Sequence, residues 1–275
     1  MSNATVCLCF DFDAVSGWIH GHGATDSPVK LSRGRYGPEV AAPRILNLFD
    51  RLDVPATWFT PGHTIESFPE ICGEVHDRGH DVQHHGWHHT PPAKFAGREA
   101  ERADFERGIE TIRDLTGEKP TGYRSPSWDF SAHTLDILQE LDFEWDSSLM
   151  GHDFEPYRVR ELPTADSDEP YVAGEETDLL EFPVSWHRDD WPSLQFTPGR
   201  SGRPLPDEEA VFDGWYEQFD WMYENVEDGV FTLTMHPQVT GQPPRLRYLE
   251  AFVESVRAKQ DVEFALVNDV ARGII

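Results

Sequence analysis

Residues 5–13, TVCLCFDFD, contain the pattern that decides the fold. Side chains alternate across a β-strand, so two cysteines and two aspartates share one face, while the other face is apolar. The shared face carries Cys7, Cys9, Asp11 and Asp13. Up to the two aspartates the strand is therefore apolar on both faces, which is typical of a parallel sheet covered by helices. In such folds the sites are built at the carboxyl ends of the strands, where the two aspartates lie. Solvated strand-end aspartates are the alternative, and the cysteines are typical core residues.

The alternation of short apolar runs and amphipathic stretches continues along the chain. We expect further strands at residues 54–60, 80–84, 122–124, 143–146, 179–183, 230–235 and 262–267, and helices at 43–52, 97–116 and 131–141. Repeated β-then-α units indicate a parallel sheet, and the length and strand number favour a closed barrel over an open sheet. Residues 189–206 are expected to form a long loop that is too short to separate domains. The pattern thus predicts one α/β domain over residues 1–275.

The composition limits the class of protein. The 275 residues include 23 Lys and Arg against 50 Asp and Glu, which gives a formal charge of −27. An apolar content of 38% is enough for a core, so a disordered acidic chain is excluded. A strongly negative field repels phosphate backbones and argues against a nucleic-acid partner. Scarce lysines and evenly spread acidic residues favour a salt-adapted (halophilic) protein, with an ordinary acidic protein as the alternative.

The cellular location is expected to be cytoplasmic. No stretch approaches the about 18–20 apolar residues that a membrane span needs, and the N-terminus lacks the features of a signal peptide. Three cysteines (Cys7, Cys9 and Cys72) make a poor disulfide framework and suit a reducing compartment. The sequence therefore predicts no membrane partner, and it indicates no particular oligomeric state.

The densest cluster of candidate ligands is residues 80–89, HDVQHHGWHH, with five of the thirteen histidines. His85 and His89 are four residues apart, so both rings can face one point on a helical turn or tight loop. Imidazoles with one carboxylate are the usual protein ligands of catalytic zinc. A non-specific histidine patch is the alternative. His84 and His88 are expected to be neighbours rather than ligands.

Two further strand ends carry polar residues. Arg124 ends the short strand at 122–124 and can pair with a carboxylate, which keeps that carboxylate ionised and oriented. Trp128, four residues later, offers a flat apolar wall. His236 directly follows the buried strand at 230–235, and Asp146 is its expected partner. The alternatives are a structural ion pair, a core tryptophan and a structural histidine.

Together these segments resemble the polysaccharide deacetylase (NodB-homology) family of amide hydrolases over nearly the whole chain, residues 5–270. The family's four motifs match FDFD at 10–13, HGWHH at 85–89, RSP at 124–126 and LTMH at 233–236. The family usually has two adjacent aspartates, whereas Phe12 separates them here. This spacing resembles a peptidoglycan deacetylase-like subgroup that is similar to allantoinases and cyclic-imide hydrolases. Some relatives there lack a metal, but the three ligand residues retained in this chain favour one.

The resemblance implies an irregular (β/α)7-like barrel that binds a divalent metal, most often zinc. The metal ligands it implies are Asp13, His85 and His89. Asp11 would then be the base that activates water, and Arg124 would orient it.

The resemblance also implies the remaining roles. His236 would be the acid that protonates the leaving nitrogen, Asp146 would tune it, and Trp128 would line the acyl pocket. From the chemistry of amide hydrolysis we add the backbone N–H of Ser127 as an oxyanion donor. Tryptophans near the expected mouth, Trp87 among them, are candidates for contacts with substrate; the set is Trp18, Trp87, Trp128, Trp186 and Trp191.

The expected function is hydrolysis of a non-peptide C–N bond, with N-deacetylation of an acetylated carbohydrate favoured. Because no export signal is expected, a soluble intracellular substrate is favoured, such as an acetylated sugar, an allantoin-like ureide or a cyclic imide. Hydrolysis of a small cyclic amide or ureide is the alternative reaction. A binding protein that keeps the barrel without catalysis is the alternative of another class.

Overall fold

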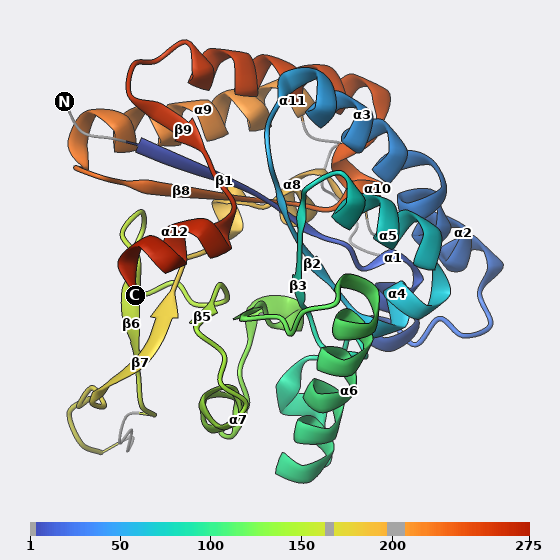
Figure 1. The fold of residues 1–275 in the computed structure, drawn as a ribbon, viewed down its shortest axis with the longest axis vertical. Helices are drawn as coiled ribbons and strands as arrows, with labels where there is room; N and C mark the ends of the chain where they lie inside the picture. Colours follow the sequence, from blue (N-terminus) through green and yellow to red (C-terminus); the bar gives the residue numbers. More distant parts are fainter. Residues whose placement is uncertain (1–3, 163–167, 197–206) are drawn as a thin grey trace.

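The structure is a computed structural model that describes residues 4–162, 168–196 and 207–275. A central, mostly parallel sheet is surrounded by helices (Figure 1). The strands are β1 (Ala4–Asp11), β2 (Thr57–Thr60), β3 (Asp81–His84), β4 (Gly122–Tyr123), β5 (Trp145–Asp146), β6 (Tyr157–Arg160), β7 (Glu176–Glu181), β8 (Val230–Met235) and β9 (Val262–Phe264). The α-helices are α1 (Ala14–Ser16), α2 (Pro28–Tyr36), α3 (Ala42–Leu52), α4 (Gly62–Ser67), α5 (Pro69–Asp77), α6 (Arg98–Thr116), α7 (Thr134–Glu140), α8 (Asp190–Leu194), α9 (Glu208–Asn225), α10 (Pro237–Thr240), α11 (Pro243–Arg257) and α12 (Val267–Ile274).

Strand β1 lies inside the sheet, where it pairs with three other strands. The strand order is β6-β7-β5-β4-β3-β2-β1-β8, and only β6 is antiparallel to its neighbour. β8 pairs along most of β1, while β2 pairs with its carboxyl end and β9 with its amino end. A parallel bridge joins Asp189, in the segment after β7, to Thr234 of β8. This bridge links the segment after β7 to β8, and residues that follow β1, β3, β4 and β8 line one space.

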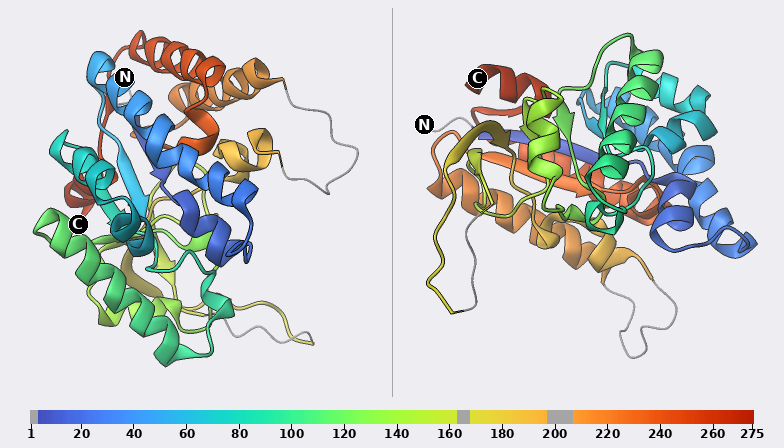
Figure 2. Two further views of the ribbon diagram at one scale, coloured as in Figure 1. Left: turned by 90° about the vertical axis from the view of Figure 1, so that its right-hand side faces the viewer. Right: turned by 90° about the horizontal axis from the view of Figure 1, so that it is seen from below.

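The two faces of β1 pack in different environments, which confirms the predicted alternation. Phe10 and its alternating apolar partners face the cluster formed with α3, α9 and α11, whereas Cys7 and Cys9 pack inside the sheet. α9 and α11 lie side by side over this face (Figures 1 and 2). The ring of Phe10 stacks on that of Trp58 at 4.6 Å, so truncation of Phe10 to alanine is expected to cost about 3–5 kcal/mol.

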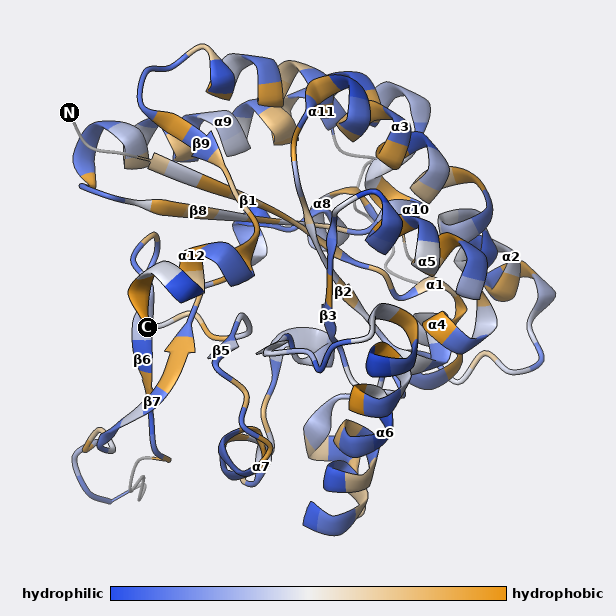
Figure 3. Ribbon diagram, viewed as in Figure 1, coloured by the Kyte–Doolittle hydropathy of each residue, from blue (hydrophilic) through white to orange (hydrophobic). Residues whose placement is uncertain are grey.

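Apolar and polar residues are distributed in agreement with this packing. The strands β1, β7 and β8 carry much of the apolar sequence, and polar residues cover the outer surface of α6 (Figure 3). α6 is capped by Gly117, which adopts the left-handed conformation (φ 83°) that commonly ends a helix at glycine. In the described ranges, no helix combines the length and the apolar character that crossing a bilayer requires.

The expected α/β architecture with a parallel sheet is confirmed, and four local expectations are corrected. β6 is not predicted, because it is a short strand at the edge of the sheet whose pairing with β7 is antiparallel and irregular. β2 begins only at Thr57, after the Val54-Pro55 turn, and α7 begins at Thr134 rather than Ser131. Within the predicted loop 189–206, Asp189 caps the helix α8, and residues 197–206 lie outside the described part.

Candidate active site

Two carboxylates lie at the carboxyl end of β1. Asp11 is the last residue of the strand, and Asp13 follows two residues later, where the chain turns into α1. Both are nearly inaccessible, with 3% and 4% of their surface exposed. The hydroxyl of Thr64 donates to the backbone carbonyl of Asp13 and fixes this turn. The two buried charges therefore need partners, and each aspartate has different ones.

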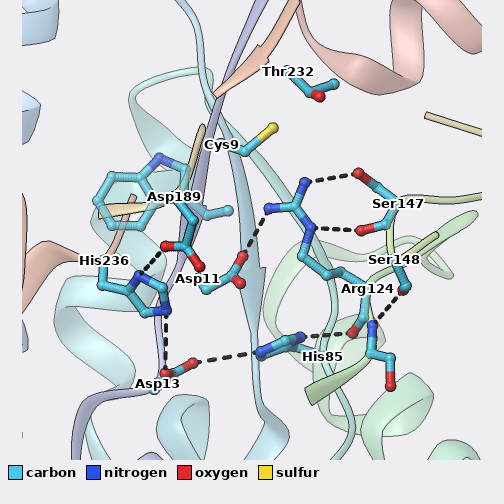
Figure 4. A network of polar contacts seen from close by, with 12 residues as sticks. Cys9, Asp11, Asp13, His85, Arg124, Ser147, Ser148, Asp189, Thr232 and His236 are labelled. Carbon is cyan, nitrogen blue, oxygen red and sulfur yellow. Dashed lines mark hydrogen bonds and ion pairs between the residues drawn. The ribbon is translucent and has the colours of Figure 1, made fainter. Parts of the chain in front are cut away.

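Asp13 lies at the centre of a group of imidazoles. Its Oδ1 is 3.5 Å from Nε2 of His85 and 3.4 Å from Nε2 of His89, and its Oδ2 is 3.8 Å from Nε2 of His236. One ligand atom from each of Asp13, His85 and His89 lies within 4.8 Å of the others. Figure 4 shows Asp13 and His85 pointing toward one another, with His236 on the other side of the aspartate. The three predicted ligands therefore meet.

The loop after β3 is fixed so that His85 and His89 face Asp13. Nδ1 of His85 lies 2.6 Å from the carbonyl oxygen of Arg124 and donates to it, which leaves Nε2 with its lone pair toward Asp13. Asp104 of α6 accepts from the backbone N–H groups of Trp87 and His88 and pairs with the His88 ring at 2.6 Å. A helix outside the sheet thus anchors the loop that carries the second imidazole.

Two neighbouring histidines are not part of this group, as predicted. His84 is buried, stacks on Phe105 with ring centroids 5.1 Å apart, and approaches the carbonyl of Phe105 through Nε2. His88 turns toward Asp104 instead of the aspartates of β1. Both therefore stabilise the loop rather than contribute ligand atoms.

The group around Asp13 fits a divalent metal ion. Oδ1 of Asp13 and Nε2 of His85 are buried without a hydrogen-bond partner, as expected for atoms that complete a coordination shell. Burial would raise the pKa of Asp13, but the imidazoles of His89, His85 and His236 lower it well below its usual range. Burial lowers the pKa of His89 to about 4, so this ring is neutral. A carboxylate with two neutral imidazoles is a donor set suited to zinc or a similar ion.

Asp11 has a different partner, as the sequence predicts. Nη1 of Arg124 donates to Oδ1 of Asp11 at 2.9 Å, and the guanidinium is fully buried. Two further N–H groups of Arg124 donate to Ser147, Nε to its carbonyl at 2.9 Å and Nη2 to its hydroxyl at 2.7 Å. The guanidinium also lies over the ring of Phe59, 4.0 Å from its centroid. Because these contacts fix the guanidinium, Arg124 holds the carboxylate of Asp11 in one orientation.

His236 follows β8 and pairs with Asp190, so the predicted pairing with Asp146 is wrong. Nδ1 of His236 lies 2.7 Å from Oδ1 of Asp190, and its backbone N–H donates to Oδ2 of the same residue at 2.9 Å. Asp146 instead turns toward Glu181 and Ser148. Burial alone would lower the pKa of His236, but the charges of Asp190, Asp189 and Asp13 raise it to about 10. The ring is therefore an imidazolium at neutral pH.

Asp189 and Asp190 are the site residues that the sequence reasoning missed. Asp189 caps α8 by accepting from the N–H of Trp191, and its Oδ1 lies 3.6 Å from Nδ1 of His236. Burial raises the pKa of Asp189 to about 8, although the charge of His236 opposes this shift. The available signal was a pair of acidic residues beginning a short helix after a predicted strand, a position where a cap is expected.

A cavity of about 220 Å³ opens above these groups. Its polar side is formed by the aspartates and imidazoles just described, and its apolar side by Trp128, Trp186 and Trp191. Trp128 and Trp186 stack with ring centroids 4.3 Å apart. Ser127 lines the same cavity, and both Ser127 and Trp128 have positive φ angles, 66° and 51°. This unusual turn places two residues of the predicted substrate pocket at the cavity.

Trp87 does not line this cavity, so its predicted contact with substrate is wrong. Gly86 adopts a φ of 72°, and the chain turns there so that Trp87 packs against α4 and α6. Its indole N–H donates to Glu66 at 2.7 Å, and Arg107 lies 3.2 Å from the ring centroid. The reversal at Gly86 separates Trp87 from its neighbour His85 and gives it a structural role.

Comparisons with known proteins connect this chain to one family. The model of the family described as polysaccharide deacetylase matches residues 36–145. A peptidoglycan deacetylase from Helicobacter pylori is 38% identical over 274 residues, which cover 95% of this chain and 92% of that protein. A solved structure from Mycobacterium smegmatis, described as that of a proposed polysaccharide deacetylase, is 33% identical with a TM-score of 0.85, and the match covers 99% of this chain and 90% of that one.

The fold and site define a deacetylase-type hydrolase barrel. The chain belongs to the polysaccharide deacetylase family, and thus to hydrolases that act on acetylated substrates. An allantoinase structure also has this fold, with a TM-score of 0.78 at 18% identity over 98% of this chain and 90% of that one. At that identity the likeness concerns the fold alone.

Proposed function

We propose that this protein is a metal-dependent hydrolase of non-peptide C–N bonds that removes the acetyl group from an N-acetylated carbohydrate. The observation that carries the proposal is that three groups lie around one cavity. They are the carboxylate of Asp11 held by Arg124, the three candidate metal ligands around Asp13, and the imidazolium of His236 held by Asp190. Each is a component that amide hydrolysis requires. The peptidoglycan deacetylase among the relatives supports a carbohydrate substrate.

Asp13, His85 and His89 would hold the metal, for which we propose zinc. A bound divalent ion lowers the pKa of water to about 7 and polarises a carbonyl oxygen. The hydrogen bond from His85 to the Arg124 carbonyl keeps Nε2 free for this role.

Asp11 is the proposed general base. Its carboxylate lines the cavity and takes the proton of the attacking water. Arg124 neutralises the charge of Asp11 and prevents its rotation, so that the carboxylate has one productive orientation.

His236 is the proposed general acid. Nδ1 donates to Asp190, and Nε2 carries the other proton toward the cavity, where it can pass to the leaving nitrogen. Asp190 is fully buried and fixes the ring while it stabilises the imidazolium. Acid and base thus come from different strands on opposite sides of the substrate.

Trp128 and Ser127 form the proposed acyl pocket. The indole gives the acetyl methyl group an apolar wall, and the backbone N–H of Ser127 is the proposed second donor to the oxyanion. A cyclic amide or ureide is the second candidate substrate, because the cavity of about 220 Å³ suits a compact ring as well as one acetamido group.

We also propose a cytoplasmic location, which three buried cysteines without a disulfide support. The function is tested by assaying protein purified without chelator on acetylated chito-oligosaccharides, allantoin and cyclic imides. Acetate release is the readout for the oligosaccharides, and chromatographic detection of the ring-opened carboxylate is the readout for allantoin and the imides. We expect acetate from the oligosaccharides, and His236→Ala to lower kcat by about 10²–10⁴-fold. Turnover of the imides alone would favour the second candidate. Tight sugar binding without turnover would favour a binding protein.

A further inference from the structure

Two buried carboxyl groups face one another inside the sheet, away from the proposed metal ligands. Asp146 of β5 and Glu181 of β7 are directly paired in the parallel register of these strands. Both side chains have no exposed surface. They are so close that Oδ2 of Asp146 and Oε1 of Glu181 both accept from the backbone N–H of Ser148, each at 3.0 Å.

Among the described residues, no lysine, arginine or histidine forms an ion pair with either carboxyl group. The positive charge of Arg124 acts on Asp146, but the guanidinium itself donates to Asp11 and Ser147. The other titratable groups that face the pair are Tyr123 of β4 and Tyr157 of β6, and burial raises the pKa of both phenols, so they stay neutral. Two buried like charges at this separation are prohibitively unfavourable.

The hydrogen bonds indicate where a proton resolves this conflict. Both oxygens of Asp146 accept from Ser148, through its N–H and its hydroxyl. Oε1 of Glu181 accepts from the N–H groups of Ser148 and Leu149. Oε2 of Glu181 is buried and has no hydrogen-bond partner among the described residues. If Oε2 carries a proton, it can donate a hydrogen bond to the carboxylate of Asp146.

The segment 147–149 connects the pair to the candidate active site. On one side it is held by the carboxyl groups through Ser148 and Leu149. On the other side Ser147 accepts two hydrogen bonds from Arg124, and the hydroxyl of Ser148 accepts from the N–H of Ser125 at 2.8 Å. Ser125 begins the turn that carries Ser127 and Trp128.

We propose that Asp146 and Glu181 share one proton and act as positioning residues for Arg124 and for the turn at 125–128. The shared proton follows from the pair alone, while the positioning role in catalysis rests on the proposed function. Burial raises the pKa of Asp146 to about 6 and that of Glu181 well above its usual range, in agreement with a proton on Glu181. Loss of this proton at alkaline pH leaves two negative carboxylates beside the segment 147–149, and their mutual repulsion displaces the segment.

The test compares the wild type with Glu181→Gln, which mimics the protonated acid, and Glu181→Ala, which removes both its donor and its acceptors. At pH 7 the infrared spectrum of the wild type is expected to contain a protonated-carboxyl C=O band, and the difference spectrum against Glu181→Gln isolates it from other buried acids. Absence of that band in the difference spectrum overturns the shared proton.

Hydrogen exchange measures the positioning role without any substrate. We expect the amides of residues 124–128 and 147–149 to exchange faster in Glu181→Ala, and to stay protected in Glu181→Gln even at alkaline pH, where the wild type loses protection. Unchanged exchange in Glu181→Ala overturns the positioning role.

Kinetics then connect the pair to the reaction. With an active substrate, kcat is expected to fall by about 10–100-fold in Glu181→Ala, while Glu181→Gln retains it and extends activity to higher pH. Equal kcat values and pH profiles in all three proteins overturn the role in catalysis. A wild type that hydrolyses no amide contradicts the proposed function, whereas the spectra and exchange data still decide the shared proton and the positioning.

Discussion

Asp190 holds His236 at two points, because Oδ1 lies 2.7 Å from Nδ1 of the ring and Oδ2 accepts the backbone N–H of the same residue at 2.9 Å. Oδ2 also accepts from the hydroxyl of Thr240 at 2.6 Å. The carboxylate therefore fixes the main chain and the ring of His236 together. A single side chain sets both the position and the charge of the proposed acid.

Asp190→Asn should lower kcat by about 10²-fold or more at neutral pH, since the amide no longer stabilises the imidazolium. The measurement is the steady-state rate of acetate release, with circular dichroism to establish folding. Thr240→Val is the matched control, because it removes one hydrogen bond to Asp190 and leaves its charge, and it should cost far less. A folded Asp190→Asn variant with the rate of the wild type would contradict the assignment of His236.

Removal of one ligand should release the metal. His85→Ala is expected to lower the bound zinc, measured by elemental analysis, to the level of chelator-treated protein and to abolish turnover, because two ligands hold a catalytic ion poorly. His152→Ala removes an exposed histidine that pairs with Glu155, and it should leave both the metal content and the rate unchanged. Stoichiometric zinc in His85→Ala would place the ion elsewhere.

Two of the five tryptophans that the sequence suggested for substrate contact should behave differently from one another. Trp128→Ala opens the apolar wall of the cavity, and we expect KM to rise by about tenfold or more, as the loss of a buried aromatic contact predicts. Trp87→Phe breaks the hydrogen bond to Glu66 outside the cavity and should change the melting temperature but not KM. An increase in KM with Trp87→Phe would return this residue to the substrate site.

The acidic surface leads to a prediction about salt. The protein has a formal charge of −27, so its acidic side chains repel one another at low ionic strength. Salt weakens this repulsion, because the screening length shortens from about 10 Å at 0.1 M to about 3 Å at 1 M. We therefore expect the melting temperature to rise steadily up to molar sodium chloride. Sucrose of equal osmolality is the control, because it carries no charge and should stabilise less. An equal effect of sucrose would favour an ordinary acidic protein.

The metal ligands could be predicted from the sequence because short-range patterns determine them. Asp13 lies two residues beyond a strand whose alternation is clear, and His85 and His89 lie within one loop. Parallel strands end at the same edge of the sheet, so these residues meet without knowledge of further contacts. Arg124 follows the same rule, and it does pair with Asp11.

The partner of His236 could not be predicted in this way. Asp190 lies 46 residues from His236, and the bridge between Asp189 and Thr234 decides that they meet. Asp146 also ends a strand, but it lies opposite Glu181 of the neighbouring strand β7 and pairs with that residue. Such a choice between two strand-end carboxylates depends on tertiary register, which the local pattern does not contain.

The last prediction concerns acid stability and a histidine outside the active site. His80 has only 5% of its surface exposed, and its Nδ1 accepts from the N–H of Ala56 at 3.2 Å. Burial lowers its pKa to about 4, below the value of about 6.5 expected in the unfolded chain. The unfolded state thus binds the proton first as the pH falls. The stability that neutral His80 contributes is present above pH ~6.5 and is lost as the pH falls toward 4.

In urea unfolding between pH 7 and pH 4.5, the wild type should lose up to about 1.4 kcal/mol per pH unit through this group. His80→Asn retains an acceptor for Ala56 but does not titrate, so it should be less stable at pH 7 and show a shallower loss toward acid. His152→Asn, at an exposed position, should keep the slope of the wild type. Equal slopes in all three proteins would show that His80 is not buried as a neutral ring.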